Sequence, residues 1–302
     1  MNYIFIGKSM AIPNLFIIGS AKSGTTALFE MLKNHPDVFM PVNKEPQFFC
    51  NDGLYEKGLD YYLNTFYKNS DNIDVVVDAT PHYMYFEKVA KRLSSDLKSV
   101  DKKFIVVLRN PIDRAYSLYW NMVKEGVEDL SFEEALASEE TRLNDMDLSA
   151  NCSLLYSYVD SGLYSKQLKA YFKYFDREDF LILFQEDLNA KSNEVYASIC
   201  NFLGIKTNKI DSLGRHNESA VTRYKFVHSF LRGESIIKRS LGLFFPHSLK
   251  YKIVDFLIKF NSKKFKYPAM NEETEDHLKN VFRTEIDELG RLLNKDLSRW
   301  LN

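Results

Sequence analysis

The sequence predicts a single α/β domain in which a central parallel sheet is flanked by helices. Four short apolar runs of the buried-strand type alternate with segments whose apolar residues recur at helical spacing. This alternation favours parallel strands joined by right-handed crossover helices. The 302 residues are 45% hydrophobic, enough for one sizeable core, and no internal repeat or interdomain linker is visible. We therefore expect residues 1–302 to form one domain.

Each element follows from its residues. Strands are predicted at Leu15–Ile18, Val75–Val77, Phe104–Leu108 and Phe180–Phe184. Helices are predicted at Thr26–Leu32, Glu87–Leu97, Ile112–Val123, Leu163–Phe175 and Glu194–Leu203. A last helix is expected from Asp276 to Leu293, with core-facing Leu278, Val281, Phe282, Ile286, Leu289 and Leu293. Residues 38–72 lack periodicity, and we expect a long functional loop there.

The loop after the first strand has the features of an anion site. The strand runs into Gly19, a small-residue loop with Lys22 follows, and Gly24 opens the next helix. A strand, a tight loop and a helix N-terminus direct several backbone N–H groups at one point, which suits a phosphate or sulfate. In the nucleoside-triphosphatase P-loop the lysine follows the second glycine, whereas here it precedes it. A metal-bound triphosphate is thus disfavoured, and the structural alternative is an ordinary turn with one solvated lysine.

A second cluster follows the third predicted strand. Arg109 stands at the carboxyl end of that strand, where open α/β sheets bind ligands, and Ser117 lies in the next helix. An arginine fork and a hydroxyl can hold a second phosphate. Taken alone, an arginine in this place is more often part of a surface ion pair. Together the two clusters favour a ligand with two phosphate-like groups.

These residues resemble the donor-binding motifs of sulfotransferases. Gly-Ser-Ala-Lys-Ser-Gly-Thr-Thr-Ala-Leu is similar to their 5′-phosphosulfate loop, and Leu-Arg-Asn-Pro-Ile-Asp-Arg-Ala-Tyr-Ser to their 3′-phosphate motif. Glu-Pro-Gln-Phe-Phe at 45–49, Thr-Pro-His-Tyr at 80–83 and Lys-Tyr-Pro at 266–268 resemble the heparan sulfate (carbohydrate) branch. The resemblance implies a P-loop nucleotide-kinase-like fold. It also implies 3′-phosphoadenosine 5′-phosphosulfate (PAPS) as sulfuryl donor and 3′-phosphoadenosine 5′-phosphate (PAP) as product.

The resemblance assigns roles to single residues. Lys22 would contact the 5′-phosphosulfate and stabilise the leaving phosphate, while Arg109 and Ser117 would hold the 3′-phosphate. The remaining loop donors would be Ser23, Gly24, Thr25 and Thr26. Glu45 matches the general base that takes a proton from the acceptor hydroxyl or amine as that atom attacks sulfur in line. No metal is expected, because a sulfuryl group carries less negative charge than a phosphoryl group.

The sequence departs from the family pattern on the acceptor side. Heparan-type enzymes have Glu-Lys before the Thr-Pro of the second strand, where this chain has Asp78 and Ala79. A substrate-side lysine is therefore missing. Of the basic loop before Lys-Tyr-Pro, only Lys263 carries over. A loop similar to one in bacterial members adds Asn217 and Arg223 as candidate cofactor contacts.

His82 is the rival of Glu45 as catalytic base. Cytosolic small-molecule sulfotransferases have a histidine near the end of this strand, but in a displaced register, and a lone histidine there is more often structural. The alternative for Glu45 is a surface ion pair with Lys44. Its apolar neighbours Pro46 and Phe48 favour a pocket instead. Glu45 is therefore the expected base.

The composition of the chain limits the classes of partner and the cellular compartment that we expect for this protein. A formal net charge of −1 provides no basic field for nucleic acid. Cys50, Cys152 and Cys200 show neither paired nor metal-binding spacing, so we expect reduced thiols. No convincing signal peptide and no run of about 18–20 apolar residues is found. We expect a cytoplasmic protein of bacterial type, and the oligomeric state is not predicted.

The predicted function is transfer of the sulfuryl group from PAPS to a hydroxyl or amine of a carbohydrate or glycolipid. We expect residues 13–125 to bind the donor and residues 126–302 to form the acceptor side of the same domain. One alternative is a P-loop kinase or nucleoside triphosphatase, because Asp78 after an apolar strand imitates a magnesium aspartate. Another is a non-catalytic nucleotide- or polyanion-binding protein of the same fold.

Overall fold

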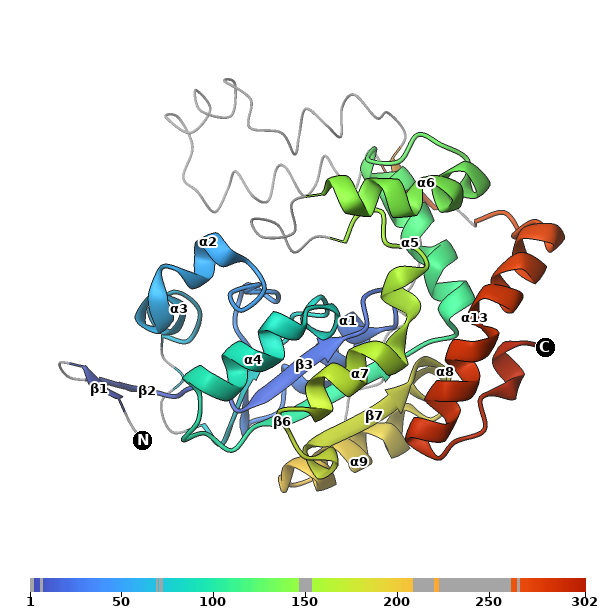
Figure 1. Cartoon of the computed structure of the whole chain (residues 1–302). Helices are drawn as coiled ribbons and strands as arrows, with labels where there is room; N and C mark the ends of the chain where they lie inside the picture. Colours follow the sequence, from blue (N-terminus) through green and yellow to red (C-terminus); the bar gives the residue numbers. More distant parts are fainter. Residues whose placement is uncertain are drawn as a thin grey trace.

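A five-stranded parallel sheet with strand order β4-β5-β3-β6-β7 forms the centre of the protein (Figure 1). The computed structural model describes residues 3–5, 8–68, 70, 73–146, 154–208, 220–222, 262–264 and 267–302. The strands of the sheet are β3 (Leu15–Gly19), β4 (Val38–Phe39), β5 (Val75–Asp78), β6 (Lys103–Leu108) and β7 (Phe180–Phe184). The predicted α/β fold with a parallel sheet is confirmed.

Helices cover both faces of the sheet. They are α1 (Thr25–Leu32), α2 (Asp52–Tyr55), α3 (Gly58–Phe66), α4 (Glu87–Asp96), α5 (Pro111–Glu125), α6 (Phe132–Asp145), α7 (Tyr164–Phe172), α8 (Gln185–Ala190), α9 (Ser192–Leu203) and α13 (Glu272–Leu293). Short 3-10 turns lie at Tyr83–Tyr85, Asp160–Gly162, Arg177–Asp179 and Ser298–Trp300. Two small antiparallel pairs join β1 (Tyr3–Phe5) to β2 (Lys8–Met10) and β8 (Ala220–Thr222) to β9 (Ser262–Lys264).

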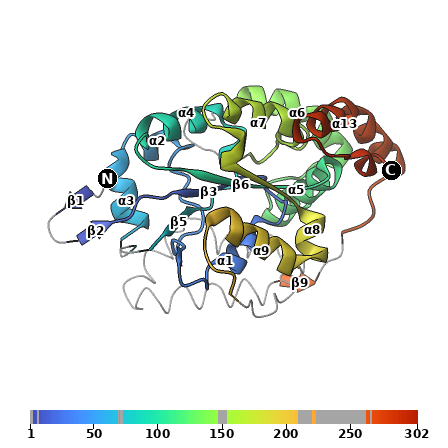
Figure 2. The same ribbon diagram turned by 90° about the horizontal axis from the view of Figure 1, so that it is seen from below.

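Each face of the sheet has its own apolar core, because successive side chains of a strand point to opposite faces. Phe16 and Phe104 pack on the side of α4, α7 and α13, whereas Ile17 and Ile105 pack on the side of α1 and α9. Figure 2 shows the sheet between these two helical layers. The strands therefore have continuous apolar sequences, which is why all the predicted strands could be recognised.

The segment from β4 to β5 differs from its prediction. The expected long loop at 38–72 contains β4, α2 and α3. These elements have only 2, 4 and 9 residues, which is too short for a clear periodicity. The six helices that were predicted elsewhere in the chain are all present among the described residues, as α1, α4, α5, α7, α9 and α13.

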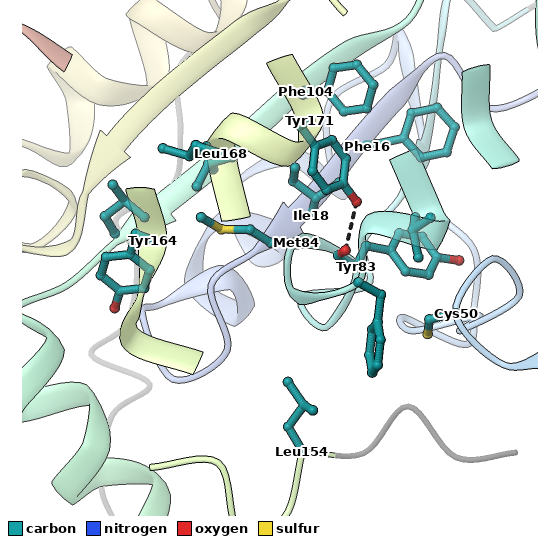
Figure 3. Packing of buried hydrophobic residues seen from close by; sticks show 14 of the residues in the cluster. Phe16, Ile18, Cys50, Tyr83, Met84, Phe104, Leu154, Tyr164, Leu168 and Tyr171 are labelled. Carbon is teal, nitrogen blue, oxygen red and sulfur yellow. Dashed lines mark hydrogen bonds between the residues drawn. The ribbon is translucent and has the colours of Figure 1, made fainter. Parts of the chain in front are cut away.

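Tertiary contacts tie α7 to the segment after β5. The Tyr171 hydroxyl donates a hydrogen bond to the Tyr83 carbonyl at 2.7 Å, as Figure 3 shows. Phe104 lies in the same core, with its ring centroid 5.8 Å from that of Phe16 and 4.6 Å from that of Phe180. This aromatic core fixes where the segment after β5 emerges from the sheet.

The last helix, α13, packs one stripe against the domain. Phe282 is fully buried, and a Cβ atom on Gly162 would lie 2.8 Å from its ring, so this contact requires glycine. The prediction that Val281 faces the core was wrong, because its side chain is 40% exposed. Position 281 lies at the margin of the apolar stripe, where sequence spacing does not decide the orientation.

The cysteines correct another expectation. Cys50 is disulfide-bonded, whereas Cys200 is a buried free thiol. Cys152 lies outside the described residues. The expectation of reduced thiols was wrong for Cys50, because disulfide formation depends on spatial distance, which sequence spacing does not reveal.

None of the helices in the described ranges combines the length and apolarity needed to cross a membrane.

The packing of α13 gives a first test. Phe282→Ala should lower the free energy of unfolding by about 3–5 kcal/mol, since it leaves a cavity in the core. Val281→Ala, one residue earlier, should change it by less than about 0.5 kcal/mol, because the side chain faces solvent. Urea unfolding followed by circular dichroism measures both, and equal losses would contradict the observed orientation of the helix.

Candidate active site

The carboxyl ends of three neighbouring strands meet at one edge of the sheet. From the central strand β3 the chain first passes to β4 and β5 on one side and then crosses to β6 on the other. Open α/β sheets bind ligands at such a switch point. The loop 20–24, the segment 79–83 and Arg109 follow β3, β5 and β6 directly. The fold thus brings the predicted motifs to the same edge.

The loop after β3 is built to present backbone N–H groups. Ser20 N donates to the Val107 carbonyl at 2.8 Å, and the hydroxyl oxygens of Ser20 and Ser23 are 2.6 Å apart. Gly24 caps α1 with a φ of 100°, a conformation that favours glycine. No side chain caps this helix within the described residues, and its first turn holds no acidic residue. The first-turn N–H groups therefore suit an anionic ligand.

Lys22 is a desolvated cation at the centre of this loop. Its Nζ donates to Asn121 Oδ1 at 2.8 Å. The pKa of Lys22 is lowered to about 8, chiefly by burial and also by the cations of Lys124 and Arg109, while Glu125 and Glu45 act in the opposite direction. These charges therefore lie close to one another. A negatively charged ligand would relieve the repulsion between the cations.

Arg109 is held by the neighbouring loop. Its Nη1 donates to the Lys22 carbonyl at 3.2 Å, and its own carbonyl accepts a hydrogen bond from the Tyr164 hydroxyl at 3.1 Å. The Arg109 Nε is buried without a hydrogen-bond partner among the described residues. A buried guanidinium N–H in this state fits a ligand with acceptor oxygens. Ser117 is half-buried on α5, and Asn121 lies four residues further on the same face.

Glu45 lies close enough to both Lys22 and His82 to affect their pKa values. Lys44 Nζ donates to Glu45 Oε1 at 2.8 Å and also reaches Thr26 Oγ1 at 3.4 Å. The ion pair that was the structural alternative for Glu45 is thus present, and one third of the Glu45 side chain is exposed. Burial lowers the pKa of His82, and the nearby Glu45 raises it. Either group could serve as base on this geometry.

The remaining predicted donor contacts have different outcomes. Ser23 and Thr25 are buried and Thr26 is exposed. Asn217 and Arg223 lie outside the described residues, and Lys263 lies in β9, of which only the backbone is described. Asn121 was not predicted as a site residue, although its i+4 spacing from Ser117 is a usable signal. No sequence signal marks the Tyr164 hydroxyl, whose role depends on tertiary contacts.

Asp78 does not behave like a magnesium ligand. It is fully buried, and its carboxylate accepts hydrogen bonds from Thr80, Tyr83 and Tyr62 at 2.7, 2.9 and 2.6 Å. Burial raises the pKa of Asp78 to about 6, against the effect of these hydroxyls. A carboxylate already occupied by hydroxyl donors and shielded from solvent is a poor metal ligand. This weakens the kinase alternative, which relied on Asp78.

The raised pKa of Asp78 predicts a pH-dependent stability. Folding favours the protonated carboxyl, so its contribution is complete below about pH 4 and is lost as the pH rises through about 6. The unfolding free energy of the wild type minus that of Asp78→Asn should fall by about 2 kcal/mol from pH 4 to pH 7. Urea unfolding across this range measures the difference, and a flat profile would contradict the shift.

Comparisons with known proteins agree with this geometry. The family model described as "Sulfotransferase domain" matches residues 13–290. Human heparan sulfate glucosamine 3-O-sulfotransferase 3B1 is 30% identical over 241 residues, which cover 80% of this chain and 55% of the relative. Mouse bifunctional heparan sulfate N-deacetylase/N-sulfotransferase 4 is 27% identical over 310 residues, or 96% of this chain and 31% of the relative. The chain thus spans about half the length of the first of these relatives, and less of the second.

A solved structure supports the same assignment over the whole chain. The crystal structure of a sulfotransferase from Alicyclobacillus acidocaldarius superposes with a TM-score of 0.71 and 25% identity, covering 97% of this chain and 100% of that one. The predicted family, with its likeness to heparan sulfate sulfotransferases, is confirmed. Because the match extends over both anion motifs and most of the chain, this protein belongs to the sulfotransferase domain family.

Proposed function

We propose that this protein transfers the sulfuryl group of PAPS to a hydroxyl or amine of a heparan sulfate-like carbohydrate. The observation that carries the proposal is the meeting of Lys22 and Arg109 at the switch point of the sheet, where Arg109 Nη1 contacts the Lys22 carbonyl. The two cations belong to the two predicted phosphate motifs. Such a pair suits a donor with a phosphosulfate at one end and a phosphate at the other.

The residues fit the donor at both of its charged ends. The uncapped N-terminus of α1 and Lys22 would hold the 5′-phosphosulfate. Ser117 and Arg109, whose buried Nε has no hydrogen-bond partner within the described part of the chain, would hold the 3′-phosphate. Asn121 would give up its hydrogen bond to Lys22 Nζ when the donor arrives, since the lysine would then turn to the bridging oxygen.

The chemistry follows from these positions. The acceptor oxygen or nitrogen forms a bond to sulfur while the bond from sulfur to the bridging oxygen breaks. Glu45 takes the acceptor proton, and the negative charge that develops on the phosphate of PAP is stabilised by Lys22. Catalysis rests on positioning and charge stabilisation, as in phosphoryl transfer. We propose that these steps need no metal.

The acceptor class rests on the relatives. The proteins named above are heparan sulfate glucosamine 3-O-sulfotransferases and heparan sulfate N-sulfotransferases. A carbohydrate of the heparan sulfate kind is therefore the first acceptor to test. Because Ala79 replaces the lysine of that family, the acceptor site of this chain has one cation fewer. Less densely sulfated and unsulfated glycans, including glycolipid head groups, belong in the same panel.

Donor binding gives the first test of the proposal. Calorimetric titration with PAP in EDTA should show binding that AMP, which lacks the 3′-phosphate, does not match. Arg109→Gln should remove this preference, because it deletes the guanidinium fork. Equal affinities for PAP and AMP, or a magnesium-dependent preference for ATP, would contradict the proposal and favour the kinase alternative.

The titration of Lys22 adds a pH dependence to donor binding. Because the pKa of Lys22 is lowered to about 8, the free lysine loses its charge above that pH. PAP affinity should therefore fall about tenfold from pH 7 to pH 9, as expected for one ionisation near pH 8. Lys22→Met should bind PAP more weakly with a flat profile over the same range. A wild-type profile that matches that of Lys22→Met would refute the role of Lys22.

The base is tested by substitution. Glu45→Gln should lower kcat about 10²–10⁴-fold while PAP affinity stays unchanged, since it removes only the proton acceptor. The matched control is Glu87→Gln, a half-exposed glutamate paired with Lys173 on the surface, which should retain wild-type kcat. His82→Asn tests whether His82, the alternative to Glu45, is the base. If His82→Asn causes the large loss and Glu45→Gln does not, the assignment of the base is reversed.

A further inference from the structure

The backbone that follows Glu45 is held in an uncommon conformation. Gln47 has a φ of 56°, although it is not glycine. A non-glycine residue in the left-handed region costs about 1–3 kcal/mol and persists only where its surroundings hold it. Besides Asn51 N and Arg92, which donate to the Gln47 and Phe49 carbonyls, two hydroxyls of the segment after β5 hold this backbone. Gln47 N donates to Thr80 Oγ1 at 3.3 Å, and Phe49 N donates to the Tyr83 hydroxyl at 3.2 Å.

Both accepting hydroxyls donate in turn to the same buried carboxylate. Thr80 Oγ1 lies 2.7 Å from Asp78 Oδ1, and the Tyr83 hydroxyl lies 2.9 Å from Asp78 Oδ2. A hydroxyl has one proton, and an ionised carboxylate can only accept. Asp78 therefore accepts a hydrogen bond from each hydroxyl. The lone pairs of the two hydroxyl oxygens are then left facing the backbone N–H groups. The carboxylate sets the direction of both hydrogen bonds to the segment after Glu45.

A third hydroxyl, that of Tyr62, contacts Asp78 but has no described hydrogen bond to the backbone of residues 45–49. The Tyr62 hydroxyl is 2.6 Å from Asp78 Oδ2, and Tyr62 is as fully buried as Tyr83. Among the described contacts its hydroxyl meets Asp78 and the Tyr67 hydroxyl, but no backbone N–H group of residues 45–49. The ring of Tyr62 packs on Phe48 and Phe49, so the two tyrosines differ in their hydroxyls: only that of Tyr83 accepts a hydrogen bond from Phe49 N.

We propose that Asp78 is a positioning residue for sulfuryl transfer, acting through the Thr80 and Tyr83 hydroxyls to hold the backbone segment that aims Glu45. The inference rests on the proposed function, because that function makes Glu45 the base that takes the acceptor proton. Asp78 itself is too deeply buried to touch the acceptor or the donor. Its effect on the reaction passes through the two hydroxyls and the backbone of Gln47 and Phe49.

The position of Glu45 matters for a physical reason. Proton transfer requires the base within hydrogen-bond reach of the acceptor proton. A displacement of about 1 Å in such a group can lower the rate about 10²-fold. A loop that loses one of its two hydrogen bonds to the Thr80 and Tyr83 hydroxyls would therefore lose turnover, while the loops that hold the donor keep their own contacts.

Kinetics of three hydroxyl deletions test the proposal. Tyr83→Phe and Thr80→Val should each lower kcat at least tenfold with unchanged PAP affinity, and Thr80→Ser should restore most of the loss. Tyr62→Phe removes an equally buried hydroxyl from the same carboxylate and should stay within about twofold of wild type. If all three deletions lower kcat equally, Asp78 acts only through the stability of the fold and the proposal is overturned.

Amide hydrogen exchange tests the same relay without any activity. Tyr83→Phe should lose protection at Phe49 N, and Thr80→Val at Gln47 N, whereas Tyr62→Phe should keep both. Unchanged protection in Tyr83→Phe and Thr80→Val would overturn the relay. This readout separates the two failures, since a relay confirmed by exchange in a protein that binds no PAP would count against the proposed function alone.

A double-mutant comparison links the relay to Glu45. In the Glu45→Gln background the base is absent, so adding Tyr83→Phe should lower kcat by much less than tenfold. A full additional tenfold loss would show that Tyr83 acts on the reaction by another route, and would overturn the proposed path through Glu45.

Discussion

The contacts that join the loop after β3 to the end of β6 hold the rest of the site in place. The pairing of these strands shifts its register between Ile17 and Gly19, which re-aims the loop. Ser20 N then bonds the Val107 carbonyl, and Arg109 Nη1 bonds the Lys22 carbonyl. Because each anion motif supplies part of the support of the other, neither can move alone.

The same arrangement places like charges together before any ligand is present. Lys22 lies near the cations of Arg109 and Lys124, and its pKa is lowered chiefly by burial and also by these two charges. Asp78 is also ionised at neutral pH in a buried position, where hydroxyl donors offset only part of its desolvation. A negatively charged ligand would offset the repulsion acting on Lys22, and by binding the folded protein it would stabilise that state by mass action.

Much of this could be predicted from the sequence, because the decisive signals are local. The apolar runs into Gly19 and Arg109 fix the sheet edge, and Gly24 marks the start of α1. What escaped prediction depends on contacts between distant segments. The Tyr164 hydroxyl reaches the Arg109 carbonyl across 55 positions, and the disulfide of Cys50 also requires knowledge of distance in space. Of the three hydroxyls on Asp78, those of Thr80 and Tyr83 lie only two and five positions away, whereas that of Tyr62 comes from α3, 16 positions earlier, and only the fold shows that all three converge on one carboxylate.

The contact between Asn110 and the end of the chain has a consequence for biosynthesis. Asn110 caps α5, and its Nδ2 donates to the Trp300 carbonyl, 190 positions further along. Ribosomes add about 5–20 residues per second, so these partners emerge roughly 10–40 s apart. During that interval the sheet can form while the residue after Arg109 lacks its C-terminal support. The nascent chain therefore reaches a nearly complete sheet well before the residue after Arg109 gains its contact with Trp300, and residues translated much later complete the surroundings of an early motif.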